Sequence, residues 1–420
     1  MLPGTAVRWA TKHGFMRAGI NAAARKGDEQ ARFFVDPAVR ADPYPFYRGI
    51  RETAPLVRGR LMWATARHDL AGAVLRHEAF GVGFSDRPLP APVGLMFRFS
   101  RRSSPIGPVD PPSMLVTDPP DHTRYRRLVS KVFTARAIEG LRPRIEQTCA
   151  ELLRDKPADL IADFASLLPV TVIAEILGVP LDMRQKFLAW GNAAAPTLDL
   201  GLAFSTYRQT EVNIRHVNDW MRGHFARLRR DPGDDLLSQL VRLDDLSEDE
   251  LLATAGLLLA AGFETTVNLL GTGAWLLMRH PEQLAILREQ PQRWGNAVEE
   301  TLRFDSPVQV TARVCRKATE FGGEAIQPGH VVMAMLGGAN RDPEVFPDPD
   351  TFDVTRTNAR EHLSFSGGVH YCLGAALARL EGEIGLRMLF ERYPDLRIDG
   401  EPHRRTTRVL RGFESLPVTI

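Results

Sequence analysis

Apolar residues recur every three or four positions along most of this chain, and that spacing predicts a protein built mainly of helices. Helices are expected at Pro43–Thr53, at Arg67–His77, within 138–178 (two helices), within 184–229 (two helices) and from about Ser247 to Arg279. Alternation of apolar and polar residues is confined to short segments. It predicts a hairpin from 55–58 and 61–65 and a strand within Pro307–Val314. The fold class is therefore mainly α with a small β-rich flank.

One long stretch, Gly81 to Pro112, has no periodicity and is rich in Gly, Pro, Phe and Arg. A loop of this length within a compact domain is usually functional or disordered. Its apolar side chains favour a loop that folds over a ligand, because a disordered linker carries few of them. They are Phe84, Leu95, Met96, Phe97 and Phe99.

Composition narrows the class of protein. Of 420 residues, 44% are hydrophobic, and 53 Lys and Arg against 51 Asp and Glu give a net charge of +2, which offers no reason to expect nucleic-acid binding. No apolar run has the length that spans a bilayer, and no signal peptide is evident. Three cysteines without zinc or disulfide spacing fit a reducing cytoplasm. We expect an N-terminal extension at 1–35, one domain at 36–420 and a monomer.

The motif richest in chemistry is Phe-Ser-Gly-Gly-Val-His-Tyr-Cys-Leu-Gly at 365–374, which leads into a helical run. A thiolate at Cys372 can serve as an axial ligand to haem iron where backbone N–H groups and a helix N-terminus face the sulfur. Gly368 and Gly374 permit such a backbone, through positive φ or close approach. The alternative is that Cys372 is a small buried residue, which is the usual role of a lone cysteine.

The whole string Phe-x-x-Gly-x-His-x-Cys-x-Gly resembles the signature of the cytochrome P450 family, the haem-thiolate monooxygenases. Ser366 stands where many members have Gly. The resemblance covers roughly Asp36 to Ile420 and implies the P450 fold, haem b as cofactor, Cys372 as the metal ligand, and Phe365, His370 and Gly374 beside the haem.

A second motif, Ala-Gly-Phe-Glu-Thr-Thr, lies at 261–266 inside the predicted long helix. The Thr265 hydroxyl can bond the carbonyl of Ala261, and with Gly262 this predicts a local distortion of the helix. Glu264 and Thr265 supply an acid and an alcohol for proton transfer. Alone, the pattern is also typical of ordinary buried helix. The resemblance implies the oxygen-activation helix, with Ala261 and Gly262 beside the haem and Glu264 and Thr265 catalytic.

Three further positions gain a role only from the resemblance. His122 and Arg126 share one helix face, and Arg313 lies on the predicted strand; as isolated residues, each is more simply a surface charge. By resemblance, all three bind haem propionates. Glu300 and Arg303, at i and i+3, resemble the family's buried pair that locks its helix to the proline-rich segment before the Cys loop.

The resemblance implies a monooxygenase that inserts one oxygen atom of O₂ into a hydrophobic small molecule, whether lipid, terpenoid, steroid or polyketide. The chain carries neither a flavin-binding phosphate loop nor iron–sulfur cysteines, so a separate ferredoxin and ferredoxin reductase are expected as electron donors. Arg127, Lys131 and Arg379 form a candidate basic docking face, or a solvated surface. The alternatives are a peroxide-driven peroxygenase and a non-catalytic haem protein that senses a ligand.

Overall fold

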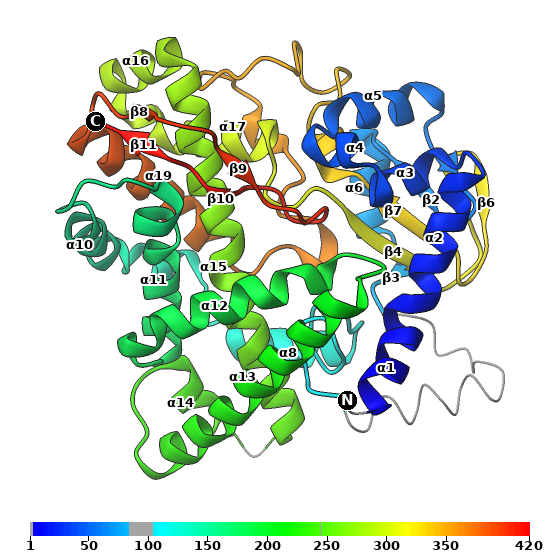
Figure 1. Ribbon diagram of the computed structural model, residues 1–420, viewed down its shortest axis with the longest axis horizontal. Helices are drawn as coiled ribbons and strands as arrows, with labels where there is room; N and C mark the ends of the chain where they lie inside the picture. Colours follow the sequence, from blue (N-terminus) through cyan, green and yellow to red (C-terminus); the bar gives the residue numbers. More distant parts are fainter. Residues whose placement is uncertain (1–2, 84–103, 244) are drawn as a thin grey trace.

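The computed structural model describes residues 3–83, 104–243 and 245–420 (Figure 1). Its helices are α1 (Pro3–Trp9), α2 (Phe15–Arg25), α3 (Glu29–Val35), α4 (Pro37–Ala41), α5 (Tyr44–Thr53), α6 (His68–Arg76), α8 (Asp121–Val129), α9 (Ala135–Glu139), α10 (Arg142–Leu152), α11 (Leu167–Leu177), α12 (Arg184–Ala194), α13 (Phe204–Arg230), α14 (Leu236–Leu240), α15 (Glu248–Arg279), α16 (Pro281–Glu289), α17 (Trp294–Phe304), α18 (Leu336–Ala339) and α19 (Ala375–Arg392). Helices α5, α6, α10 to α13 and α15 confirm the predicted ones. The five apolar residues predicted to cover a ligand, Phe84 to Phe99, lie outside the described residues.

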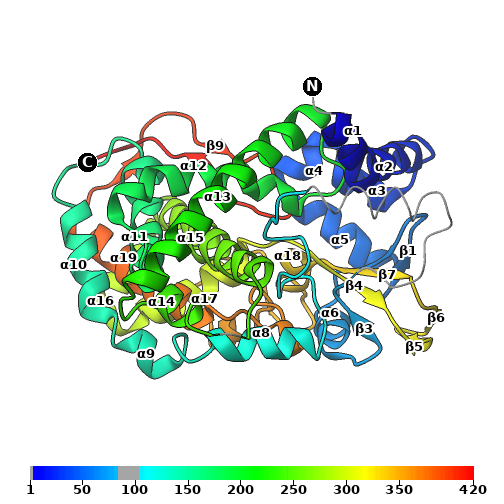
Figure 2. The same cartoon turned by 90° about the horizontal axis from the view of Figure 1, so that it is seen from below.

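Helix α15 runs through the middle of the molecule, with α11, α12, α17 and α19 packed against it (Figures 1 and 2). It begins at a capping box, in which Ser247 and Glu250 exchange side-chain to backbone hydrogen bonds. By length and composition, α15 is the described helix that is apolar enough to cross a membrane, but 67% of its apolar window is buried inside the protein. That burial is typical of a core helix.

The small sheet lies at the side of the helical body. The strands are β1 (Val57–Arg58), β2 (Trp63–Thr65), β3 (Phe80–Gly81), β4 (Thr311–Cys315), β5 (Thr319–Phe321), β6 (Glu324–Ile326), β7 (Val331–Ala334), β8 (Arg397–Ile398), β9 (His403–Arg404), β10 (Phe413–Ser415) and β11 (Val418–Thr419). Five form a sheet in the order β1-β2-β7-β4-β3, and β1 pairs with β2 as the predicted antiparallel hairpin. The remaining strands form two-stranded pairs, and β9 with β10 brings the C-terminal segment back over the helices.

The N-terminal residues 3–35 are helical and pack on the rest of the chain. Arg8 and Glu211 on α13 form an ion pair whose side chains are each 4% exposed. The Trp9 indole N–H donates to the carbonyl of Leu202 at 2.8 Å. The N-terminal helices therefore hold the connection between α12 and α13 against the body of the protein.

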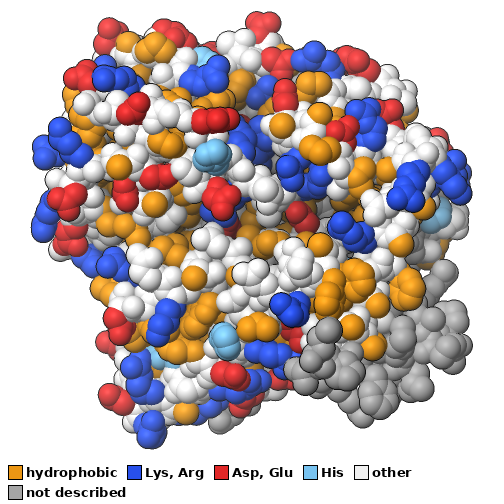
Figure 3. Space-filling view, in the orientation of Figure 1, with side chains coloured by type: hydrophobic (Ala, Val, Ile, Leu, Met, Phe, Trp, Pro, Cys, Tyr) orange, Lys and Arg blue, Asp and Glu red, His pale blue; other side chains and the backbone are white. Residues whose placement is uncertain are grey.

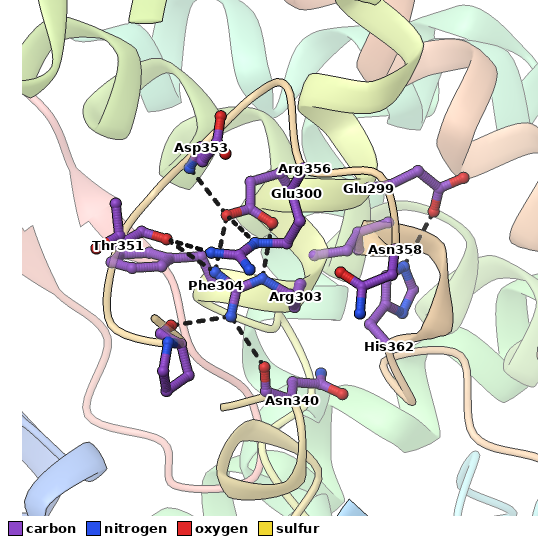
Figure 4. Close-up of polar contacts among 12 residues, drawn as sticks. Glu299, Glu300, Arg303, Phe304, Asn340, Thr351, Asp353, Arg356, Asn358 and His362 are labelled. Carbon is purple, nitrogen blue, oxygen red and sulfur yellow. Dashed lines mark hydrogen bonds and ion pairs between the residues drawn. The ribbon is translucent and has the colours of Figure 1, made fainter. Parts of the chain in front are cut away.

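The pair predicted from Glu300 and Arg303 is confirmed as a buried lock (Figure 4). Both side chains are fully buried, and the Arg303 Nε and Nη2 atoms each donate to the carboxylate at 2.7 Å. Arg303 also donates to three backbone carbonyls, those of Asn340, Pro349 and Thr351. The Asp353 N–H donates to Glu300 at 2.9 Å. This network fixes α17 to the irregular segment that precedes the Cys loop.

The surface carries no block of one charge on the face seen in Figure 3, where Lys and Arg side chains alternate with Asp and Glu side chains. This mixture agrees with the small net charge of the whole sequence.

Candidate haem-thiolate site

The Cys372 loop has a backbone that few side chains tolerate. Gly368 has φ +65°, and a Cβ there would lie 2.4 Å from the carbonyl oxygen of Leu75, so this position requires glycine. Ser366 has φ +62°, which explains why glycine is common at its place in the family. The Cys372 N–H donates to the carbonyl of Phe365 at 2.9 Å, and this bond closes the loop.

Cys372 is an exposed residue whose thiol has charged neighbours. Desolvation raises the pKa of the thiol, whereas the Gly374 N–H and the Arg126 and Arg379 guanidinium groups oppose that rise by favouring the thiolate. Helix α19 begins just after Cys372, as predicted, and its N-cap Gly374 has φ −86° rather than a positive value. A Cβ at Gly374 would meet no described heavy atom within 4 Å, so there is room beside the sulfur.

Helices α15 and α19 run in the same direction and bring the two motifs to one end of the helix pair. Their close approaches join Leu269 to Gly382 and Gly273 to Leu386. Thr265 lies four residues before Leu269 on α15, and Ala378, near the start of α19, lies four residues before Gly382. Cys372 lies just before this point. Ala261 is exposed and Thr265 half-buried on a helix that is otherwise mostly buried, as expected of residues that line a site.

The oxygen-helix motif is confirmed in part of its geometry. The Thr265 hydroxyl donates to the carbonyl of Ala261 at 3.3 Å, as predicted. The helix nevertheless runs unbroken from Glu248 to Arg279, so the predicted distortion does not interrupt it. A Cβ at Gly262 would lie 2.6 Å from Ile173, which makes the approach of α11 a sufficient reason for glycine here. A haem contact at Gly262 stays a prediction.

Four of the predicted cofactor ligands come together from three elements. The rings of His122 on α8 and His370 in the Cys loop lie 4.3 Å apart, and Arg126 and Arg313 act electrostatically on His370. Burial, then the neighbouring His122 and Arg313, lower the pKa of His370 to about 4, and burial and Arg126 lower that of His122. Both shifts favour the neutral imidazole.

This cluster fits a dianionic group. His122 Nδ1 and His370 Nε2 are buried and have no hydrogen-bond partner among the described residues. Arg313 is 4% exposed, its side chain bonds neutral oxygens only, and burial lowers its pKa to about 10. Two orphaned ring nitrogens and a buried cation suit the two propionates of haem.

Three site residues escaped the sequence analysis. Arg405 forms an ion pair with Glu264 at 2.8 Å, Asp118 lies 3.9 Å from His370, and Glu299 binds His362 and Arg379 beneath the Cys loop. Asp118 lies four residues before His122 in the same motif, so the sequence could have indicated it as a site residue. Arg405 and Glu299 carry no local pattern, because their partners are distant in sequence or belong to irregular segments.

Comparison with known proteins decides the family. A family model described as Cytochrome P450 matches residues 295–408. Putative cytochrome P450 140 of Mycobacterium tuberculosis is 48% identical over 99% of this chain and 97% of its own length. The chain belongs to the cytochrome P450 family. It is therefore a monooxygenase family member, and the family binds haem through a cysteine thiolate.

Other P450s extend the likeness to solved structures and to proteins of known name. The 6-deoxyerythronolide B hydroxylase of Saccharopolyspora erythraea is 40% identical over 90% of this chain and 96% of its own. The structure of P450BioI with an acylated acyl carrier protein superposes with a TM-score of 0.84 at 36% identity, covering 92% of this chain and all of that one. Mycobacterium smegmatis CYP164A2 gives 0.82 at 36%, over 93% and 99%. The predicted P450 fold is thus confirmed.

Proposed function

We propose that this P450 binds haem b through Cys372 and hydroxylates a hydrophobic small molecule with O₂ and two electrons. The observation that carries the proposal is the exposed Cys372 just before α19, at the same end of the helix pair as Thr265. Bound haem would supply oxygen activation, and its thiolate ligand favours cleavage of the O–O bond.

The polar residues around the cofactor would bind its propionates, and the small or apolar residues would pack beside the macrocycle. The ring N–H groups of His122 and His370 would donate to propionate oxygens, and Arg126 and Arg313 would balance the negative charge. Phe365 supports the loop from below, with the Arg379 guanidinium 4.5 Å above its ring centre. Ala261, Gly262 and Gly374 have side chains small enough for a flat macrocycle to approach the backbone.

Proton delivery would fall to α15. Thr265 Oγ donates to the Ala261 carbonyl, which leaves its lone pairs free to accept a hydrogen bond from the site. Burial raises the pKa of Glu264, although Arg405 opposes the rise, so the carboxyl group is suited to hold and release a proton. This acid and alcohol also favour an O₂-dependent enzyme over a peroxygenase, because peroxide brings its own protons.

The substrate class follows from the relatives and the apolar predicted cover loop. One structural neighbour is named as a polyketide synthase cytochrome P450, and another is in complex with an acyl carrier protein that carries hexadec-9Z-enoic acid. Polyketides and fatty acyl chains are therefore the first candidates, followed by terpenoids and steroids. A ferredoxin and its reductase would donate the electrons. We further propose a cytoplasmic monomer in which 36–420 form the P450 domain.

The decisive experiment is the absorption spectrum of the dithionite-reduced protein under carbon monoxide. Wild type is expected to give the red-shifted band of thiolate-ligated haem, and Cys372→Ala is expected to lose it. Cys149→Ala is the matched control, since Cys149 is fully buried in the helical core. An unchanged band in Cys372→Ala refutes the assignment. Spectral titration with myristic acid, a macrolactone and testosterone then ranks the substrate classes. A thiolate spectrum would favour the non-catalytic haem sensor if none of the three probes is oxidised and no reductant is consumed.

A further inference from the structure

The carboxylate of Glu264 is unusually short of partners for a buried group. Its side chain is 4% exposed, and neither oxygen accepts a directed hydrogen bond from a described residue. Arg405 Nη1 lies 2.8 Å from Oε1 and is the one charged group of the described residues within ion-pair distance. An ionised carboxylate in such surroundings depends on that single cation.

Arg405 is held from two sides. Its backbone N–H donates to the carbonyl of Gly412, within the C-terminal β9–β10 hairpin. Its Nη1 atom also donates to Oδ1 of Asn192 on α12 at 3.1 Å. The side chain is 12% exposed, and its Nε atom is buried without a partner in the described structure. Arg405 thus joins three elements at the acid of α15.

The contact between α12 and α15 is tight at this point. A Cβ on Gly191 would lie 2.0 Å from the Cζ atom of the Phe263 ring, so any larger residue here would have to displace that ring. Asn192 follows Gly191 on α12, and Glu264 follows Phe263 on α15. Arg405 lies between Asn192 and Glu264 and contacts both. Movement of α12 relative to α15 would therefore change the position of the Arg405 guanidinium.

We propose that Arg405 is a positioning residue, which keeps Glu264 ionisable and couples its proton affinity to the position of α12 through Asn192. The proposal rests on the function proposed above for Glu264. Near this acid, α11 packs Ile173 against Gly262, and α12 contributes Asn192 to Arg405; both side chains are neutral. The C-terminal segment contributes Arg405, the charged group that acts on the Glu264 pKa. Without that cation, burial acts on the carboxyl group unopposed, and the protonated form is favoured to higher pH.

The test is an infrared titration of the Glu264 carboxyl group in the haem-loaded protein. Each spectrum is recorded as a difference between a background and the same background carrying Glu264→Gln, so that the protonated carboxyl band belongs to this side chain. In Arg405→Gln we expect the band to persist to a pH at least about one unit higher than in wild type. Arg405→Lys keeps the charge and is expected to lie between them.

The matched control is Arg404→Gln, which removes the adjacent arginine. Arg404 pairs with Asp305 at 3.2 Å and does not reach Glu264. We expect this variant to lower the thermal midpoint while leaving the Glu264 titration at the wild-type pH. If Arg405→Gln changes only the thermal midpoint and the titration stays in place, Arg405 is merely structural and the proposal is wrong. If Arg405→Gln does not fold, a wild-type titration in Arg405→Lys together with one unchanged in Asn192→Ala gives the same refutation.

A second readout separates this proposal from the function of Glu264. Peroxide released per electron is measured with NADPH, a surrogate ferredoxin and reductase, and myristic acid as probe. We expect the midpoint of its pH profile to move with the infrared midpoint in Arg405→Gln. If Glu264→Gln itself leaves the peroxide yield unchanged, the proton-relay function fails, whereas the infrared shift still decides the role of Arg405.

Discussion

Among the buried carboxylate–arginine pairs of this P450, Glu300–Arg303 and Glu264–Arg405 differ most plainly in their surroundings. Glu300 and Arg303 are fully buried. The guanidinium group of Arg303 donates to the Glu300 carboxylate and to backbone carbonyl oxygens (Figure 4). Glu264 and Arg405 meet through one contact, and both carboxylate oxygens lack a directed hydrogen bond from a described residue. The first pair is a part of the fold, because full bonding repays the burial of both charges.

In the second pair, the Glu264 carboxylate has few donors, so its burial is less well compensated. A carboxylate that few donors hold has a pKa that burial raises, and a neighbouring cation can then set its value. Burial alone therefore does not distinguish the fully bonded pair of the fold from the pair for which we propose a function. The number of satisfied atoms does, and four substitutions test that distinction.

The largest effect is expected from Arg303→Ala. It leaves the Glu300 carboxylate buried without its main cation and removes the donor from three backbone carbonyls. We expect a loss of about 3–5 kcal/mol in the free energy of unfolding, measured by urea denaturation. Arg387→Ala, which breaks a half-exposed pair with Glu146, should cost less than about 1 kcal/mol. Equal losses in both variants would contradict the lock.

Glu299→Gln should come next, because it removes a second well-bonded carboxylate. Burial raises the pKa of Glu299, but hydrogen bonds from His362, Arg379 and Arg360 outweigh it and lower the pKa to about 2. As pH falls, the unfolded chain takes up its proton first, near the ordinary pKa of 4.5, so the stabilisation is present above that pH and is lost toward pH 2.

The wild-type protein should therefore lose up to about 3 kcal/mol from this group across that window, since one pH unit corresponds to about 1.4 kcal/mol. Glu299→Gln should show a shallower decline in the unfolding free energy. Glu391→Gln, at an exposed carboxylate, serves as the control and should keep the wild-type slope. A slope in Glu299→Gln equal to wild type would show that Glu299 is not held ionised in the folded state.

Glu264→Gln should affect stability much less. The amide oxygen can still accept from Arg405, so the unfolding free energy should stay within about 1 kcal/mol of wild type. The sign of the pH dependence is the sharper test. Because burial raises the pKa of Glu264, the folded wild type loses stability as pH rises through that raised value, whereas Gln does not titrate. Thermal midpoints should therefore shift in favour of Gln as pH rises, and a constant difference would count against a raised pKa.

The smallest change in stability is expected from Thr265→Ala, which removes one 3.3 Å hydrogen bond to a helix carbonyl. Its effect on chemistry should be large, with haem content intact and a greater share of electrons released as peroxide. Thr265→Ser retains the hydroxyl and should retain most of the coupling. The measurement is product and peroxide per electron supplied, and unchanged coupling in Thr265→Ala would remove Thr265 from the relay.

Local sequence patterns predict several features of this site that the structure confirms. The glycine at Gly368 is required by its positive φ and the nearby Leu75 carbonyl, and the Thr265 bond to Ala261 follows from helical spacing. Gly262 shows the limit of such inference. Its motif predicted a distortion of the helix, whereas the structure shows a continuous helix and a close approach of Ile173 that is itself a sufficient reason for glycine.

Local sequence patterns were enough to predict the helix-rich class and to single out Cys372 as the candidate thiolate, because periodicity and turn chemistry are local properties of the chain. Tertiary structure decided which charges meet. Arg405 reaches Glu264 from the C-terminal hairpin, and Glu299 gathers cations from the meander and α19. Such pairings depend on packing between elements distant in sequence, and the short range of an ion pair leaves no trace of them in the local pattern.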